Sequence, residues 1–125
     1  MSRPTIAVIG ASNKRRKFGN KCVRAYSQAG FEVFPVNLHS DEIEGLPAFR
    51  TLHELAAAPD RISIYLQPDD THSLLAELAE YPEAEVWFNP GCASPKTLDQ
   101  ARAAGIDVRD GCSIVDIGMS PGRFP

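Results

Sequence analysis

Residues 5–12 read Thr-Ile-Ala-Val-Ile-Gly-Ala-Ser, a short apolar run that ends in a glycine and two small residues. An apolar run of this length is typical of a strand buried on both faces, as the strands of parallel sheets are. Small residues directly after such a strand are typical of the turn that leads into a helix. The stretch therefore predicts the first strand and the first strand–helix turn of an α/β fold.

The rest of the chain repeats this pattern. The further predicted strands are 31–37, 62–66, 85–88 and 106–109. The predicted helices are 19–30, 70–80 and 95–104, and a short helix is predicted to start at the Thr51-x-x-Glu54 capping box. Strands that alternate with helices form a parallel sheet with right-handed crossovers. We expect one doubly wound, Rossmann-like domain over residues 1–125, with five parallel strands and helices on both faces. Residues 111–125 form a tail that the pattern does not place, with one β-like patch at Ile114-Val115.

Size and composition narrow the class of protein. The 125 residues suit one compact domain, and 43% hydrophobic with 23% charged residues is ordinary for a globular protein. The apolar runs are far shorter than a bilayer span, and the N-terminus lacks the apolar core of a secretory signal. Three widely spaced cysteines indicate reduced thiols, and they show no metal-ligand spacing with the histidines. We expect a cytoplasmic protein that binds no metal and no membrane.

Charge is unevenly distributed along the chain. The net charge is −3, from 13 Lys and Arg against 16 Asp and Glu, which disfavours nucleic acid as a partner. Yet the first 31 residues contain seven basic residues and no acid, and four of the seven are Lys14, Arg15, Arg16 and Lys17. The cluster is either a solvated basic face or a site for a small polyanion.

The turn after the first strand favours the second interpretation. Backbone amides in a small-residue turn, together with a helix N-terminus, can bind phosphate. An NAD fingerprint would have glycines where this chain has Ser12 and Arg15, and an acid near the position of Asn37. A Walker loop is also absent. Ligands with one more phosphate than NAD, which are NADP and coenzyme A, suit the cations better.

Two segments, Ile6–Ser12 and Gly30–Asn37, resemble the coenzyme A-binding domain family. This family includes small stand-alone bacterial proteins and is similar to the N-terminal domain of the succinyl-CoA synthetase α subunit. The resemblance rests on the Gly-Ala-Ser turn paired with Pro35-Val36-Asn37, and it continues in order through residues 86–88 and 104–108.

The resemblance implies a coenzyme A site built from four segments that follow strands. The residues it implies are Gly10, Ala11, Ser12 and Lys17 at the phosphates, Val36 and Asn37 beside the adenosine, Gln67 and Pro68 along the cleft toward the pantetheine arm, and Asn89, Pro90 and Gly91 at its far wall. The family commonly has Pro and Lys where this chain has Leu38 and His39, and Arg where it has Gln67. Either the Lys14–Lys17 cluster replaces these cations or the ligand differs.

The sequence offers little catalytic chemistry. The phosphohistidine-bearing and nucleotide-activating parts of the synthetases have no counterpart in 125 residues, so we expect binding of coenzyme A or a short acyl-CoA without catalysis. One alternative is an enzyme, either NADP-binding or exchanging thiols through Cys92. Exchange would need a lowered pKa at Cys92, for which the helix starting at Ser94-Pro95 offers a source. Another is an interaction protein with a degenerate nucleotide site. A protein partner or a homo-oligomer stays open.

Overall fold

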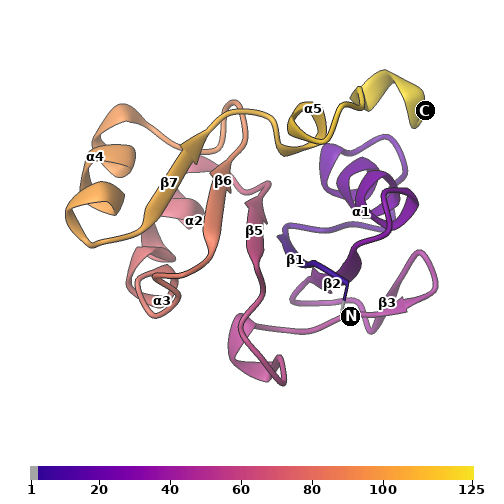
Figure 1. Cartoon of the computed structure of the whole chain (residues 1–125), viewed down its shortest axis with the longest axis horizontal. Helices are drawn as coiled ribbons and strands as arrows, with labels where there is room; N and C mark the ends of the chain where they lie inside the picture. Colours follow the sequence, from indigo (N-terminus) through magenta and orange to yellow (C-terminus); the bar gives the residue numbers. More distant parts are fainter. Residues whose placement is uncertain (1–2) are drawn as a thin grey trace.

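The computed structural model describes residues 3–125 and contains a five-stranded sheet in which all neighbouring strands are parallel. Its strands are β1 (Thr5–Ile9), β2 (Glu32–Val36), β5 (Arg61–Ile64), β6 (Glu85–Phe88) and β7 (Asp107–Asp110), in the order β2-β1-β5-β6-β7. Figure 1 shows β5 in the middle of this arrangement. A separate antiparallel hairpin is formed by β3 (Glu42–Ile43) and β4 (Leu46–Pro47). The predicted five-stranded parallel, Rossmann-like fold is confirmed.

Helices connect the strands and cover both faces of the sheet. They are α1 (Phe18–Gln28), the 3-10 turn η1 (Leu52–Glu54), α2 (Pro68–Ser73), α3 (Leu75–Leu78), α4 (Pro95–Ala103), α5 (Ser113–Asp116) and the 3-10 turn η2 (Pro121–Arg123). Among residues 3–125, no helix has the length and apolar content that crossing a membrane requires.

The alternation of side chains along β1 produces two separate cores. Ile6 and Val8 pack with Tyr26 of α1 and Ile114 of α5. Side chains alternate along a strand, so Ala7 and Ile9 face the opposite side, where they pack with residues of η1, α3 and α4. Because both faces are covered, β1 is buried throughout residues 6–9, which explains its unbroken apolar sequence.

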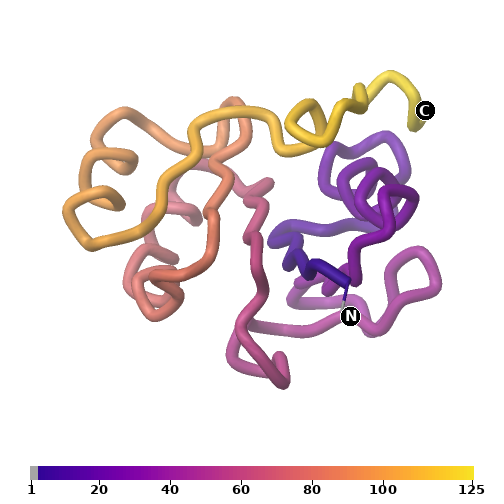
Figure 2. Tube along the Cα trace, viewed as in Figure 1, coloured from indigo at the N-terminus to yellow at the C-terminus, as the bar shows by residue number. Residues whose placement is uncertain are grey.

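The C-terminal tail belongs to the α1 side of the sheet. Ile114 and Val115, the β-like patch in the sequence, lie in helix α5. Ile114 and Phe124 are buried in the core that contains α1. In Figure 2 the C-terminal end of the chain, drawn in yellow, lies beside α1. The tail is therefore part of the packed fold.

Two predicted helices differ in the structure. The helix predicted over 70–80 is divided at Leu74 into α2 and α3. Near this break, the Thr71 and Ser73 hydroxyls donate to carbonyls four residues earlier, a contact that bends helices. The capping box at Thr51 starts only the single turn η1, because Glu54 accepts from the Arg50 N–H (2.7 Å) and the Thr51 side chain caps nothing. Ser94 caps α4 as predicted, accepting from the Thr97 N–H at 3.2 Å.

Candidate functional site

Strand order reverses beside β1, which places the candidate site at the carboxyl ends of β1 and β5. The chain passes from β1 outward to β2 and then returns to the other side of β1 to form β5. In doubly wound sheets this reversal opens a crevice outside the strand ends, where ligands bind. Gly10 follows β1 and Tyr65 follows β5, so these two residues mark the crevice.

Gly10 is required by its surroundings. Its φ is +88°, and a Cβ at this residue would lie well inside 3.0 Å of the Tyr65 carbonyl oxygen. Its N–H donates to the Val36 carbonyl at 3.2 Å, so the turn is also tied to the end of β2. A Cβ on Gly19 would collide with the Gly10 carbonyl in the same way. The two glycines let the first turn of α1 approach the end of β1.

Ala11 and Ser12 shape the turn and do not line either cavity described below. Ala11 is buried, and its carbonyl accepts from the Asn37 side-chain amide at 2.8 Å. The Ser12 hydroxyl accepts from the Lys14 N–H at 3.0 Å, and the Ser12 carbonyl accepts from the side-chain amide of Asn20 at 2.8 Å. The hydrogen bonds of both residues are thus used to hold the backbone of the turn.

The basic cluster is divided between the site and the rest of the surface. Arg15 pairs with Glu44 of the β3–β4 hairpin at 3.5 Å, whereas Arg16 and Lys17 line the crevice. Lys17 is also the residue before the first turn of α1; its side chain caps none of the free amides, and the first turn contains no acid. The N-terminus of α1 therefore keeps its favourable partial charge for an anion.

A cavity of about 530 Å³ lies on the β6 side of Gly10, and we call it the basic cavity. Its lining residues are Gly10, Arg16, Lys17, Phe18, Gly19, Ile64, Tyr65, Leu66, Gln67, Asn89, Pro90, Gly91 and Cys92. It thus joins the turn after β1, the start of α1 and the segments that follow β5 and β6.

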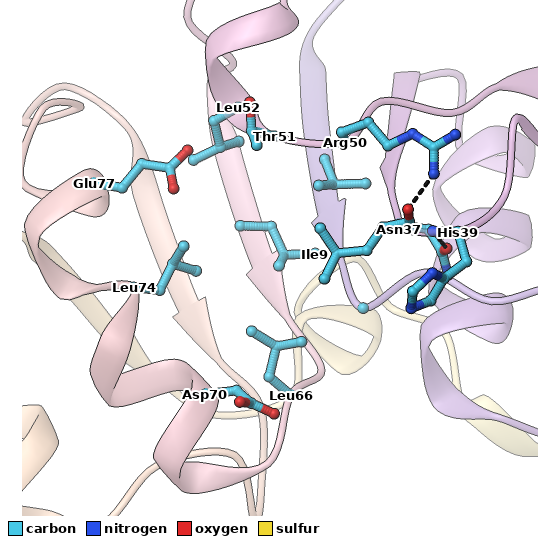
Figure 3. A pocket seen from close by; sticks show the side chains of 13 residues that line it. Ile9, Asn37, His39, Arg50, Thr51, Leu52, Leu66, Asp70, Leu74 and Glu77 are labelled. Carbon is cyan, nitrogen blue, oxygen red and sulfur yellow. Dashed lines mark hydrogen bonds between the residues drawn. The ribbon is translucent and has the colours of Figure 1, made fainter.

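A second cavity of about 430 Å³ lies on the β2 side of Gly10, and we call it the apolar cavity (Figure 3). Its lining residues are Ile9, Gly10, Val36, Asn37, Leu38, His39, Arg50, Thr51, Leu52, Leu66, Asp70, Leu74 and Glu77. Gly10 and Leu66 line both cavities, so the two are neighbours in the crevice.

The end of β2 positions Arg50 at the apolar cavity. The Phe49 N–H donates to the Pro35 carbonyl at 2.9 Å, and the Asn37 N–H donates to the Phe49 carbonyl at 2.8 Å. Arg50 then donates to the Leu38 carbonyl and to the Asp41 carboxylate. This holds a guanidinium beside Leu38 and His39, where the resemblance leads one to expect a lysine.

Asn37 and Asn89 line the cavities with side chains that are already paired. The Asn37 amide donates to Ala11, and its oxygen accepts from the His39 and Ser40 N–H groups at 2.7 and 2.9 Å. The buried Asn89 amide donates to the Ser63 hydroxyl (2.8 Å) and the Ile64 carbonyl (2.9 Å). Its oxygen accepts from the Ser113 N–H at 2.9 Å. Both asparagines fix loops at the site.

Cys92 lines the basic cavity but is only 3% exposed. Burial raises the pKa of its thiol to about 11 and outweighs the hydrogen bonds from Thr71 and the Asn89 backbone, which lower the pKa. The thiol-exchange alternative requires the opposite shift, because the thiolate is the nucleophile. Within residues 3–125, moreover, no three His, Cys, Asp or Glu side chains gather in a way that could hold a metal ion.

The structure brings most of the predicted site residues to one crevice. Those lining a cavity are Gly10, Lys17, Val36, Asn37, Gln67, Asn89, Pro90 and Gly91. Ala11 and Ser12 belong to the turn but line neither cavity, and Pro68 begins α2 outside both linings. The prediction missed Arg50, Leu52, Leu74 and Glu77 as lining residues. Leu52 lies within the Thr51-x-x-Glu54 capping box, which indicates only a helix start, and the other three lie in no motif.

Known proteins are similar to this chain in fold and in sequence. A conserved hypothetical protein from Pyrococcus furiosus superimposes with a TM-score of 0.80 at 32% identity, over 92% of this chain and 99% of that one. The uncharacterized protein YneT of Bacillus subtilis is 24% identical over 100 residues, which are 80% of this chain and 74% of YneT. The alpha subunit of acetate–CoA ligase (ADP-forming) II from Pyrococcus furiosus is 32% identical over 76 residues, 60% of this chain but 17% of that subunit. Residues 4–118 match the family described as CoA binding domain, and the chain therefore belongs to that family.

Proposed function

We propose that this protein binds coenzyme A or a short acyl-CoA across the crevice and does not itself turn it over. The observation that carries the proposal is the meeting of the apolar and basic cavities at Gly10, in a chain of the CoA binding domain family. Coenzyme A has a matching sequence of parts: an adenosine, a diphosphate and a long pantetheine arm.

In the proposed arrangement the adenosine occupies the apolar cavity and the diphosphate lies over the turn after β1. The apolar walls suit a purine ring, and the uncapped amides at the start of α1 suit the diphosphate. Arg16 and Lys17 add positive charge on that side. The pantetheine arm then follows the basic cavity between Gln67 and the 89–91 segment.

The ribose phosphate that distinguishes coenzyme A from its dephosphorylated form needs a cation near the end of β2. Leu38 and Gln67 supply none, but Arg50 lies at the cavity beside His39. Its bonds to the Leu38 carbonyl and to the exposed Asp41 carboxylate use two of its five N–H groups, so others are left for a phosphate. A guanidinium is a strong phosphate partner, because its N–H groups can form two parallel hydrogen bonds. We propose that Arg50 replaces the family's missing lysine.

Absence of turnover is the second part of the proposal. The ligase subunit is matched over 17% of its length, so its activity does not carry over to this chain. The candidate nucleophile that the sequence indicates at the crevice is the Cys92 thiol. This thiol is buried and its pKa is raised.

Calorimetric titration with coenzyme A, dephospho-coenzyme A and NADP tests the proposal. We expect one site per chain with tightest binding of coenzyme A, weaker binding of the dephospho form and no saturable binding of NADP. An Arg50→Gln variant should bind both coenzyme forms with similar affinity. Clear binding of NADP with no heat from coenzyme A would overturn the proposal.

A further inference from the structure

Glu44, at the tip of the β3–β4 hairpin, has an unfavourable backbone conformation. Its φ is +51°, and within residues 3–125 it is the one residue other than glycine whose φ is positive. Together with Gly45, whose φ is +78°, it forms the two-residue turn between the paired residues Ile43 and Leu46. Turns with two positive φ angles prefer Asn-Gly, because asparagine tolerates this conformation better than glutamate does. Local strain of this kind points to a role for the side chain of Glu44.

That side chain reaches the loop between β1 and α1. Its Oε2 atom accepts from the side-chain amide of Asn20 at 3.0 Å and lies 3.5 Å from Arg15 Nε. Asn20 is fully buried. A second contact joins the same two segments, because the Asn13 side-chain amide donates to the Glu42 carbonyl at 2.9 Å. The hairpin is thus fixed to the loop at two points.

Through Asn20 the contacts of Glu44 continue to the backbone of the loop. The Asn20 amide also donates to the Ser12 carbonyl at 2.8 Å, and the Asn20 side-chain oxygen accepts from Arg24 Nε at 2.7 Å. Arg24 in turn donates from Nη2 to the Arg15 carbonyl at 2.8 Å. Glu44 therefore belongs to a network of bonds that holds the loop backbone at Ser12 and at Arg15.

The loop needs such support because it carries like charges. Residues 14–17 are four consecutive cations, all exposed, and they repel one another. Among the ion pairs of residues 3–125, these cations take part in one, between Arg15 and Glu44. Glu44 itself lines neither the apolar nor the basic cavity. It can therefore affect binding through the position of the loop or through its negative charge.

We propose that Glu44 is a positioning residue, which holds residues 12–17 so that Arg16, Lys17 and the free amides at the start of α1 face the phosphates of the ligand. This role rests on the proposed function, because it assumes that the phosphates lie at this loop. The two possible effects of Glu44 have opposite signs. Removal of a negative charge near an anion site strengthens anion binding by Coulomb attraction. Loss of the loop position weakens it, because the loop must then be ordered when the ligand binds.

Calorimetric titration with coenzyme A tests this role in two variants of equal charge. Glu44→Asn suits the turn, but its side chain is shorter and does not reach Asn20, so the affinity should fall by roughly 3- to 10-fold, the range for ordering one or two side chains. Glu44→Gln keeps an oxygen that can accept from Asn20. It should bind more tightly than Glu44→Asn by roughly two-fold or more, the lower end for a neutral hydrogen bond.

Glu42→Gln is the matched control. It removes the same charge from the same hairpin, and within residues 3–125 its carboxylate takes part in no ion pair or side-chain hydrogen bond. Its affinity for coenzyme A should not fall. Thermal melting shows that each protein is folded at the temperature of the titration. Glu44→Gly, which also tolerates the positive φ, takes the place of Glu44→Asn if that variant does not fold.

The outcomes separate the role of Glu44 from the proposed function. If Glu44→Asn bound coenzyme A as tightly as the wild-type protein or more tightly, Glu44 would act by charge or not at all, and coenzyme A binding would stand. Equal affinities of Glu44→Asn and Glu44→Gln, or an equal loss in Glu42→Gln, would overturn the role as well. Failure of the wild-type protein to bind coenzyme A would overturn the proposed function and this role with it.

Discussion

The carbonyl oxygen of Tyr65 occupies the space that a side chain on Gly10 would need. The two residues follow neighbouring strands at the point where strand order reverses, so their contact closes the bottom of the crevice. Gly10 also has a positive φ, which places the backbone of the turn between the apolar and basic cavities. One glycine thus joins β1, β5 and both cavities.

Gly10→Ala should therefore destabilise the fold strongly. The new Cβ collides with the backbone of Tyr65, the residue directly after the central strand β5, and the positive φ adds strain. We expect a loss of roughly 3–5 kcal/mol in the free energy of unfolding, measured by urea denaturation.

Gly30→Ala is the matched control for this prediction. Gly30 has a similar φ of +92°, but nothing lies within 4 Å of an added Cβ. It should cost only about 1 kcal/mol, from backbone strain alone. Equal losses in the two variants would show that the contact with Tyr65 is unimportant.

Charge reversal at Lys17 should weaken coenzyme A binding by roughly 1–3 kcal/mol, the range for a hydrogen bond to a charged group. Both lysines are exposed, but Lys17 lines the basic cavity at the start of α1, whereas Lys14 lines neither cavity. Lys14→Glu makes the same charge change nearby and should change affinity far less, especially at 0.15 M salt, which screens exposed charges. If calorimetry gave both variants the same affinity, the cations would act only as a diffuse basic face.

Stability should fall as pH rises above about 9. Burial raises the pKa of the Cys22 thiol from its ordinary 9.0 to about 11. Between these values the unfolded chain releases the proton and the folded chain keeps it, so unfolding becomes easier with rising pH. The contribution of Cys22 is complete below pH 9, and up to roughly 3 kcal/mol of it is lost by the upper end of this range.

Urea denaturation between pH 8 and 10.5 measures this dependence, and Cys22→Ser is the variant that isolates it. Serine does not titrate in this range and can bond to the nearby Ser63 and Ser113 hydroxyls. The variant should lose less stability over the same pH interval than the parent. A slope identical to that of the parent would contradict the assignment to Cys22.

Cys92 should react slowly with an uncharged alkylating reagent at pH 7.5. Its raised pKa leaves almost no thiolate at this pH, and burial blocks access. Peptide mass mapping should find alkylation at the half-buried Cys112 before Cys92. Coenzyme A bound in the basic cavity should slow Cys92 further. Fast alkylation of Cys92 would revive the thiol-exchange alternative.

How much the sequence reveals depends on how local the cause of each feature is. The apolar run of residues 6–9 predicts a buried strand because its pattern is local. Gly10 predicts the turn because a small residue directly after a buried strand is typical of a strand–helix turn. The split helix at Leu74 escapes prediction because its apolar spacing is helical on both sides of the break.

The candidate site divides in the same way. The part that we propose for the phosphates, from Gly10 to Lys17, is contiguous in sequence, so a local pattern can indicate it. The part that we propose for the adenosine includes Arg50 and Glu77 from segments in which the sequence shows no binding motif, and only the tertiary packing around η1 and α3 brings them to one cavity. The pKa of Cys92 divides in the same way. The helix start at Ser94 is visible in the sequence and favours a lowered pKa, but the burial that raises the pKa depends on the tertiary structure.

A crystal structure of the protein grown with saturating coenzyme A tests the central claim most directly. We predict the purine in the apolar cavity, the diphosphate over the turn from Gly10 to Lys17, and the pantetheine arm along the basic cavity. Coenzyme A bound outside the crevice, or a crevice left empty at saturating coenzyme, would contradict it.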